Sequence, residues 1–296
     1  PAPLAIALPA SIAEVQAIVR WAVAHRVGIV PSGGRTGLSG GAVAANGELV
    51  LSLERMRKVL AFDAIDRTLT VEAGMALEAV QQAAAVHGLC YPVDFGSRGS
   101  CSIGGNIATN AGGIRVIRYG NTREWVAGLK IVDGRGELLE LNRGLIKNSS
   151  GYDLRQLLIG SEGTLGIVVE ATLRLTDPPP RSNVMVLALP AMDALMQVFD
   201  VCRSRLALGA FEFFTDRALH HVLAHGAQRP FDSDAPYYVI TEFDVVDGSA
   251  EADALAVFEQ CAERGLVVDG VVSVSDAQSR ALWRLRRHWR ALARGD

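Results

Sequence analysis

The hydrophobic and polar positions of this chain follow helical and strand periods in turn, and the pattern divides it into two blocks. In the first block, apolar residues at helical spacing predict helices over 11–26 and 76–88, which end near Gly28 and Gly88. Asp133-Gly134 predicts a hairpin within 125–141. Short apolar runs predict further strands at 28–31, 48–53, 68–74 and 164–175.

Beyond a proline-rich linker at 177–180, strands and helices alternate regularly. Prolines cannot continue a helix interior or a sheet ladder, so they indicate a boundary near residue 178. The predicted strands are 184–189, 210–214, 237–243 and 266–274, and the predicted helices are 191–207, 216–226, 249–264 and 276–293. This order is typical of a ferredoxin-like α+β sandwich. We therefore expect two domains, 1–178 and 179–296.

Four glycine pairs lie in two long loop-like segments, 31–42 and 92–113. Glycine loses much backbone entropy on folding, so clusters of it indicate positive φ angles or the close approach of a ligand to the backbone. Neutral Ser, Thr and Asn residues are interleaved with the glycines, and lysine is missing from both segments. Because backbone N–H groups in such loops can hold an anion without a lysine, we expect a nucleotide cofactor.

Composition and charge exclude other classes. The net charge is −3, from 29 basic and 32 acidic residues, and no long block of like charge predicts nucleic-acid binding. The four cysteines form no CxxC pair, which favours a reducing, cytoplasmic compartment. No apolar run approaches the ~18 residues of a membrane span, so we do not expect an integral membrane protein.

The common nucleotide signatures are missing. The sequence has no GxxxxGK[ST] motif, which excludes a P-loop, and no GxGxxG between a strand and a helix, which leaves a Rossmann site unsupported. A third glycine-rich stretch, GSEGTLG at 160–166, precedes a strand, and Glu162 would repel a phosphate placed there.

Six stretches of the chain form a set in a characteristic order: PSGGRTGLSGG, LSLERM, VEAG, DFGSRGSCSIGGNIATNAGG, KNSSGYDLRQLLIGSEGTLGIVVEATLRL and ALWRLR. Together they resemble the FAD-linked 2-hydroxyacid dehydrogenases, which have the flavin-binding domain shared with vanillyl-alcohol oxidase and p-cresol methylhydroxylase. D-2-hydroxyglutarate and D-lactate dehydrogenases are the members that the chain resembles most. The resemblance is very specific between 31 and 175 and looser from 180 to 275.

The resemblance implies an α+β fold in which FAD lies between two subdomains, about 1–57 and 58–178. A ferredoxin-like cap domain, expected to be incomplete at its C-terminus, follows over 179–296. The FAD pyrophosphate would meet Ser32, Gly33, Gly34, Arg35, Thr36, Gly37 and Leu38. The isoalloxazine and ribityl groups would meet Gly96, Ser97, Gly104, Gly105, Asn106, Thr109, Asn110 and Gly112. The adenine side would meet Glu162, Gly163 and Ile167.

The resemblance also bears on how the flavin is held. Some relatives attach FAD covalently through a histidine in the first glycine segment, where this chain has Arg35, so we expect non-covalent FAD. Cys101 remains a candidate for attachment, because some relatives use a cysteine in the second segment. An unactivated thiol is usually inert, which disfavours that alternative.

A 2-hydroxy acid requires a cation for its carboxylate, a base for its hydroxyl proton and an α-hydrogen directed at the flavin. By the family's LWxLR pattern, Arg286 is the catalytic residue expected to clamp the carboxylate with its bidentate fork. The family's metal-binding HxxxGDGNxH segment does not occur, so no metal ligands are assigned here, although full-length relatives are expected to hold a divalent metal. His221 and His225, spaced i, i+4, are interpreted as surface residues. Tyr152 and Asn148 could line the flavin pocket, and a buried Tyr152 that bonds to a backbone partner is an equal alternative. His288 is given no role.

The function that the resemblance implies is FAD-dependent oxidation of a D-2-hydroxy acid to the 2-oxo acid. The favoured substrate is 2-hydroxyglutarate, followed by lactate and then glycolate. Electrons would leave to a quinone, a cytochrome or an electron-transfer flavoprotein. One alternative is a non-catalytic flavin-binding subunit or fragment of a glycolate-oxidase-like complex. Another is an α+β binding protein without flavin. An exposed apolar face on an incomplete cap domain would favour a homodimer.

Overall fold

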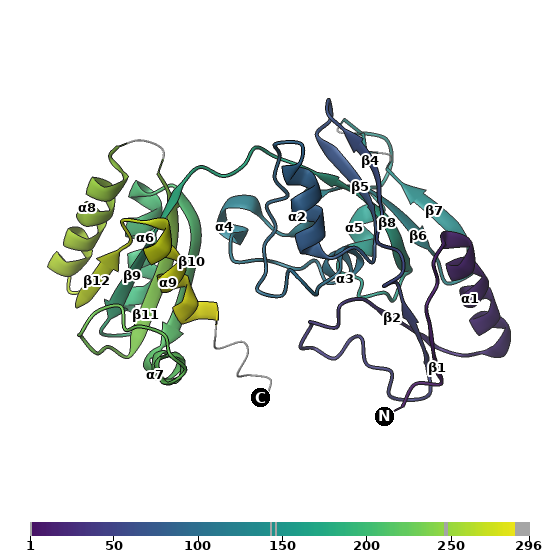
Figure 1. The fold of residues 1–296 in the computed structure, drawn as a ribbon, viewed down its shortest axis with the longest axis horizontal. Helices are drawn as coiled ribbons and strands as arrows, with labels where there is room; N and C mark the ends of the chain where they lie inside the picture. Colours follow the sequence, from purple (N-terminus) through teal and green to yellow (C-terminus); the bar gives the residue numbers. More distant parts are fainter. Residues whose placement is uncertain (1, 143, 146, 246–247, 288–296) are drawn as a thin grey trace. The chain divides into compact units, whose positions relative to one another are not determined.

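The computed structural model describes residues 2–142, 144–145, 147–245 and 248–287, and it divides into two compact units (Figure 1). The first unit comprises Pro1–Gly113 and Tyr119–Pro178. The second comprises Ile114–Arg118 and Pro179–Asp296. The short segment Ile114–Arg118 therefore belongs to the second unit, although its neighbours in sequence belong to the first.

A three-stranded parallel sheet begins the first unit, in the order β1-β3-β2. The strands are β1 (Ala5–Ala7), β2 (Ile29–Ser32) and β3 (Leu49–Ser52), and α1 (Ile12–His25) connects β1 to β2. The predicted helix 11–26 is confirmed to within one residue at each end, but its predicted cap at Gly28 is wrong, because Arg26 takes the left-handed conformation at φ 56° and ends the helix. The helix ends earlier because its buried face stops at Ala22, and the Gly28 carbonyl already accepts from the amide of Leu49.

A five-stranded antiparallel sheet completes the first unit, in the order β4-β5-β8-β6-β7. Its strands are β4 (Val59–Asp63), β5 (Thr68–Glu72), β6 (Val126–Val132), β7 (Leu138–Leu141) and β8 (Ile167–Arg174). The helical elements are α2 (Leu77–Ala85), α3 (Ile103–Ala108), the 3-10 helix η1 (Thr122–Trp125) and α5 (Arg155–Leu158). The hairpin predicted at Asp133-Gly134 is confirmed, since β6 and β7 pair from Leu129↔Leu141 to Val132↔Leu138.

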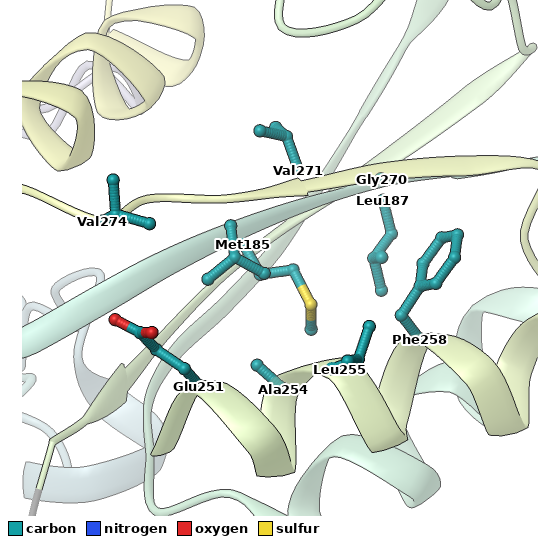
Figure 2. A pocket seen from close by; sticks show the side chains of 10 residues that line it. Met185, Leu187, Glu251, Ala254, Leu255, Phe258, Gly270, Val271 and Val274 are labelled. Atoms are coloured by element: carbon teal, nitrogen blue, oxygen red, sulfur yellow. The ribbon is translucent and has the colours of Figure 1, made fainter. Parts of the chain in front are cut away.

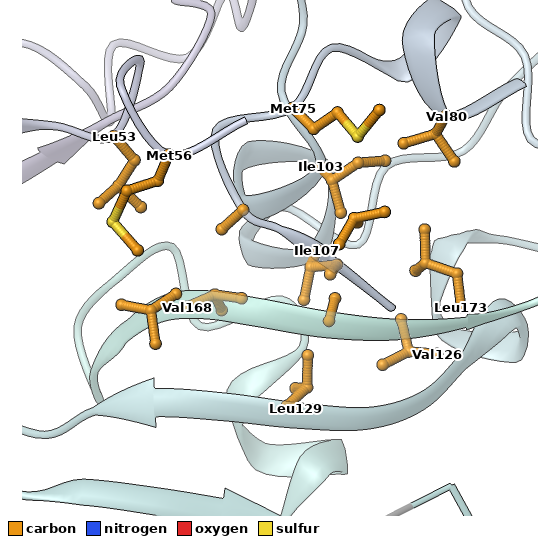
Figure 3. Packing of buried hydrophobic residues seen from close by; sticks show 14 of the residues in the cluster. Leu53, Met56, Met75, Val80, Ile103, Ile107, Val126, Leu129, Val168 and Leu173 are labelled. Carbon is orange, nitrogen blue, oxygen red and sulfur yellow. The ribbon is translucent and has the colours of Figure 1, made fainter. Parts of the chain in front are cut away.

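Helix α3 packs on this sheet and fixes the second glycine segment. Figure 3 shows Ile103 and Ile107 of α3 over side chains of β6 and β8 that include Leu129 and Val168. Both isoleucines are fully buried. Complete burial of such a side chain stabilises by about 1.5–3 kcal/mol.

The prediction that 92–113 is loop-like throughout is wrong for α3. Glycine lowers helix stability by about 1 kcal/mol relative to alanine, so Gly104-Gly105 hides this helix from pattern analysis. In the structure Gly104 permits close packing, because a Cβ there would lie 2.9 Å from the Cβ of Ala73. Burial of the two isoleucines offsets the low propensity.

The second unit is a four-stranded antiparallel sheet with helices on both faces. Its strands are β9 (Ser182–Leu189), β10 (Leu208–Thr215), β11 (Tyr237–Asp244) and β12 (Asp269–Val272), in the order β10-β11-β9-β12. Helices α6 (Ala194–Arg205) and α8 (Ala250–Glu263) cover one face, and α7 (Asp216–Ala224) and α9 (Asp276–Arg287) cover the other. The ferredoxin-like prediction is confirmed, with α7 inserted between the second and third strands. The end of the predicted helix 276–293 lies outside the described residues.

Strand β9 shows how period-two alternation builds the two faces. Met185 and Leu187 point into the core under α6 and α8, whereas Val184 and Val186 point into the core under α7 and α9. Ile114 packs against the second of these cores. The residues directly after the second glycine segment therefore pack in the second unit, and they lead into α4 (Val116–Tyr119).

Candidate functional site

The three glycine-rich segments of the first unit converge in the structure. A Cβ at Gly33 would overlap the Oγ of Ser102, and one at Gly34 would overlap the backbone at Ser100. The third segment joins them, because a Cβ at Gly163 would lie 2.9 Å from the Cγ of Pro31. The segments therefore require glycine partly because they pack against one another. Sequence analysis could not distinguish this reason for glycine from the close approach of a ligand.

The first segment presents a row of amide donors. Within the part of the chain that the structure describes, no backbone amide from Gly33 to Ala42 donates to a protein acceptor. The row begins beside Ser32, whose Oγ is buried and has no hydrogen-bond partner among the described groups. A buried hydroxyl without a partner is costly. Ser32 and these amides fit a ligand that offers several acceptor oxygens, such as a diphosphate.

Side chains of the first segment are mostly exposed. Arg35 is exposed and takes a positive φ of 52°. Leu38 is 80% exposed. Gly37 has no atom within 4 Å of a Cβ position, so its backbone faces open space. These residues lie where a ligand could reach the main chain.

The second segment is held by α3 and the turn before it. Ser102 caps α3 by accepting from the Gly105 amide, while Thr109 Oγ1 donates to the Gly105 carbonyl at 2.9 Å. Gly104 and Asn106 face the core, and their amides donate to Ala73 and Ser102. Gly96, Ser97 and Gly112, by contrast, lie at partly or fully exposed positions. The expected flavin residues of this segment therefore divide into a packed set and an accessible set.

Cys101 sits beneath the converging segments and is 2% exposed. Burial raises the pKa of its thiol, while a hydrogen bond from the Asn106 side chain opposes the rise. The thiolate is the reactive form of cysteine, so this environment disfavours covalent attachment.

The third segment docks on the end of α3. The amide of Glu162 donates to the Ala108 carbonyl at 2.8 Å, and the amide of Gly160 donates to Ile107 at 3.0 Å. Glu162 has a positive φ of 53° and is exposed, with its carboxylate beside Gly41 of the first segment. Ile167, expected on the adenine side, is 6% exposed and belongs to the core at the start of β8.

Sequence analysis missed Arg123, which links the second and third segments. Its amide donates to Asn110 Oδ1 at 3.0 Å, and its guanidinium donates to the carbonyls of Gln156 at 3.0 Å and Ile159 at 2.7 Å. Thr122, fully buried next to it, donates through Oγ1 to the Ala111 carbonyl at 2.7 Å. No local pattern marks either residue, because their partners lie up to 36 positions away.

Arg286 lies in the second unit, on α9. Its side chain is 13% exposed, and its Nε forms an ion pair with Glu212 of β10. Three residues earlier, Trp283 Nε1 donates to Glu242 Oε2 of β11 at 3.0 Å. Glu242 also pairs with Arg115 at 2.9 Å, and Asp244 pairs with Arg118. The sequence-predicted catalytic arginine is therefore one of three arginines that form ion pairs with acidic residues of β10 and β11.

A pocket of about 340 Å³ lies elsewhere in the second unit, between α8 and the β9–β12 edge of the sheet (Figure 2). Its lining is apolar apart from Glu251, and it includes Met185, Leu187, Phe258 and Val271. None of the sequence-predicted site residues lines it. With one carboxylate and no converging polar groups, it lacks the features of a catalytic site.

The remaining candidates are residues outside the three glycine segments. His221 on α7 and His225 at the C-cap of that helix are both exposed, with ring centroids 4.7 Å apart. Tyr152 is 95% exposed, and Asn148 Oδ1 accepts from the Ser150 amide. Within the residues that the structure describes, no three His, Cys, Asp or Glu side chains come together as a metal site. His288 lies outside the described residues.

No helix among the described residues is long and apolar enough to cross a membrane.

Comparison with known families assigns both parts of the chain. Residues 3–142 match the FAD binding domain family, and residues 178–295 match the C-terminal domain of FAD linked oxidases. FAD is therefore the cofactor of the matched domain, in agreement with the nucleotide predicted from the glycine segments.

Several curated relatives are similar over nearly the whole chain. A D-2-hydroxyglutarate dehydrogenase of Xanthomonas citri pv. viticola is 74% identical over 97% of this chain and 61% of the relative. One of Stutzerimonas stutzeri is 55% identical over 97% of this chain and 62% of the relative. The mitochondrial D-2-hydroxyglutarate dehydrogenase of Bos taurus is 38% identical over 94% of this chain and 52% of the relative. The chain thus spans about half to three-fifths of the length of these relatives.

Solved structures agree on the fold. A p-cresol methylhydroxylase structure superposes with a TM-score of 0.74 at 14% identity, over 95% of this chain and 60% of that one. An alkyldihydroxyacetonephosphate synthase gives 0.71 at 20% identity, over 96% and 55%. With residues 3–142 matched to the FAD binding domain and residues 178–295 to the C-terminal domain of FAD linked oxidases, the chain belongs to the FAD-linked oxidases.

Proposed function

We propose that this chain serves FAD-dependent oxidation of a D-2-hydroxy acid to the corresponding 2-oxo acid, with D-2-hydroxyglutarate as the preferred substrate. The observation that carries the proposal is the 74% identity to a protein named D-2-hydroxyglutarate dehydrogenase, over a chain in which the three glycine segments converge. The chemistry that FAD supplies when bound is acceptance of the substrate's α-hydrogen together with two electrons, as a hydride. The proton of the substrate hydroxyl goes to a base.

Three groups of residues would hold the cofactor. The amides from Gly33 to Leu38, together with the Ser32 hydroxyl, would hold the pyrophosphate. The accessible positions of the second segment, Gly96, Ser97, Gly105, Thr109, Asn110 and Gly112, would line the isoalloxazine and ribityl groups. Glu162 and Gly163 would lie at the adenine side. The packed residues Gly104, Asn106 and Ile167 would support these contacts from the core.

FAD is expected to be non-covalent. Arg35 occupies the place of the histidine that some relatives use, and the buried thiol of Cys101 has a raised pKa. Precipitation of the purified protein with acid tests this directly, because non-covalent flavin stays in the supernatant and covalent flavin stays in the pellet.

Arg286 would bind the substrate carboxylate, as a guanidinium does in many such sites. The electron acceptor would be a quinone, a cytochrome or an electron-transfer flavoprotein. The cytoplasm is the proposed compartment, since none of the four cysteines is paired in a disulfide and three of them are buried.

Turnover of the protein expressed from its complete gene tests the proposal. We expect reduction of a dye acceptor with D-2-hydroxyglutarate at a kcat/KM well above that for D-lactate or glycolate. Full flavin occupancy with no turnover of any 2-hydroxy acid would favour the alternative of a non-catalytic flavin-binding subunit. Failure to bind added FAD would contradict both.

A further inference from the structure

Two glutamates face α9 from neighbouring strands of the second unit. Glu212 shares its face of β10 with Ala210 and Phe214, and Glu242 shares its face of β11 with Tyr238 and Ile240, all of which belong to the core under α9. In the register of the sheet, Glu212 pairs with Ile240 and Ala210 pairs with Glu242. The two carboxylates are therefore diagonal neighbours on one face.

Each glutamate contacts one residue of the same helix. Glu212 pairs with Nε of Arg286, and Glu242 accepts from Nε1 of Trp283. Residues three positions apart lie on the same side of a helix, so the two contacts act on one face of α9. Together they set both the rotation of α9 and the direction of the Arg286 side chain.

The attachment of α9 to the sheet does not depend on these contacts alone. Leu282 and Leu285 are 9% and 2% exposed and pack in the same core as Val184 and Val186. Ion pairs with little exposure often add orientation rather than net stability, because desolvation of the charges opposes their attraction. The side chains of Glu212 and Arg286 are 20% and 13% exposed, which places them in that class.

Because a guanidinium is planar and rigid, the contact of Glu212 with Nε determines the direction in which the Arg286 side chain points. Its five N–H donors lie in one rigid plane, so a partner that holds Nε fixes where the terminal nitrogens point. A carboxylate ligand binds best to two parallel N–H groups, and that mode depends strongly on the direction of the plane.

We propose that Glu212 is a positioning residue that aims the guanidinium of Arg286 at the substrate carboxylate, and that Glu242 supports it by holding Trp283. The inference rests on the proposed role of Arg286 in binding that carboxylate. In this role, the position of the Glu212 oxygen that accepts from Arg286 matters, and the negative charge of Glu212 does not.

Two substitutions at Glu212 distinguish the effect of the position of its acceptor oxygen from the effect of its charge. Glu212→Gln keeps an acceptor oxygen at the same reach and removes the charge, whereas Glu212→Asp keeps the charge and withdraws the carboxylate by one methylene. The probe is glutarate, a dicarboxylate without the oxidisable hydroxyl, titrated calorimetrically into the FAD-loaded protein. We expect Glu212→Gln to bind glutarate within about threefold of wild type, and Glu212→Asp and Glu212→Ala to bind it ~10-fold more weakly.

Flavin occupancy should be unchanged in these variants, and KM for D-2-hydroxyglutarate should rise with the glutarate Kd. The melting temperature should be unchanged in Glu212→Gln and lower in Glu212→Ala, which removes the ion-pair partner of the little-exposed Arg286 Nε. Glu259→Gln and Glu259→Asp, at an exposed position of α8, are the matched controls. Trp283→Phe should weaken glutarate binding about threefold, which gives a second reading if Glu212→Ala does not fold.

The outcomes distinguish a failure of the positioning role of Glu212 from a failure of the carboxylate-binding role of Arg286. Wild-type glutarate affinity in Arg286→Ala would refute the role of Arg286 itself. Weak binding in Arg286→Ala, together with unchanged or tighter binding in Glu212→Asp, would retain that role and overturn the positioning role of Glu212.

Discussion

Gly34 contacts Ser100 so closely that a Cβ at Gly34 would overlap the Ser100 carbonyl oxygen and lie 2.7 Å from the Cα of Cys101. These neighbours are backbone atoms, which cannot rotate away as the end of a side chain can. Gly37, three residues later, has no atom within 4 Å of its Cβ position and no positive φ. The same glycine-rich segment thus contains one position fixed by the protein and one that faces open space.

The first prediction compares these two positions. Gly34→Ala should lower the melting temperature of the cofactor-free protein by roughly 5 °C or more, because overpacking against backbone costs about 1–3 kcal/mol or more. Gly37→Ala should leave that temperature unchanged and weaken FAD binding several-fold, because the added methyl group enters the space beside the amide row. Thermal melts and FAD titrations of apoprotein measure both. Equal destabilisation by the two variants would contradict the packing described for Gly34.

The second prediction concerns Gly105, whose amide is capped by Ser102. A Cβ there would lie 3.2 Å from Ser102 Oγ, and the second γ-methyl of valine would crowd it further. Gly105→Val should therefore abolish flavin binding, while Gly105→Ala should retain it with several-fold weaker affinity. Flavin content after dialysis against excess FAD measures the difference. Full occupancy in the valine variant would exclude this face of α3 from the flavin site.

The periodic elements of this chain could be predicted because their signals are local. The amphipathic helix α1 and the buried strand β8 follow apolar spacing along a few consecutive residues. Strand β4 was not predicted, since all but one of its residues are exposed and it has no alternation to detect. Helix α3 was hidden by its glycine pair, because its stability comes from tertiary burial of Ile103 and Ile107.

The site could be predicted as a set of segments and not as a set of contacts. Which glycines pack against protein, as Gly104 does on Ala73, depends on how distant segments meet. The pairing of Glu212 with Arg286 depends likewise on strand register and on the rotation of α9. The residues next to Glu212 and Arg286 in the sequence determine neither of these. Arg123 had no sequence signal for the same reason.

The third prediction tests Arg123 as the link between the second and third segments. Arg123→Ala removes two hydrogen bonds to the carbonyls of Gln156 and Ile159, and the unfolding free energy should fall by about 1–3 kcal/mol. FAD affinity should fall as well, because the 160–163 stretch loses its support. Urea denaturation and FAD titration measure these effects. Arg203→Ala, at an exposed position of α6, is the control and should change neither quantity by more than about 0.5 kcal/mol.

The fourth prediction concerns the hydroxyl of Tyr91, which is buried without a hydrogen-bond partner among the described groups. Burial, with a smaller contribution from Cys101, raises the pKa of this hydroxyl well above its ordinary value. Tyr91→Phe removes the unpaired polar group and keeps the ring, so stability should be unchanged or rise by up to about 1 kcal/mol. Denaturation of the FAD-loaded and cofactor-free forms measures this. A loss of more than 1 kcal/mol only in the FAD-loaded form would instead identify the hydroxyl as a cofactor contact.

The fifth prediction is an order of thiol reactivity. Cys101, Cys202 and Cys261 are buried, whereas Cys90 is partly exposed. Burial, with a contribution from the neighbouring Cys261 thiol, raises the pKa of Cys202 to about 12, so about one molecule in ten thousand carries its thiolate at pH 8 and about one in a thousand at pH 9. Iodoacetamide should therefore label Cys90 first, and raising the pH from 8 to 9 should leave Cys202 unmodified in the folded protein. Mass spectrometry of tryptic peptides measures the order, with labelling in urea as the control that exposes all four thiols. Early modification of Cys101 at pH 8 would show an activated thiol beneath the glycine segments, and would reopen the case for its covalent attachment to FAD.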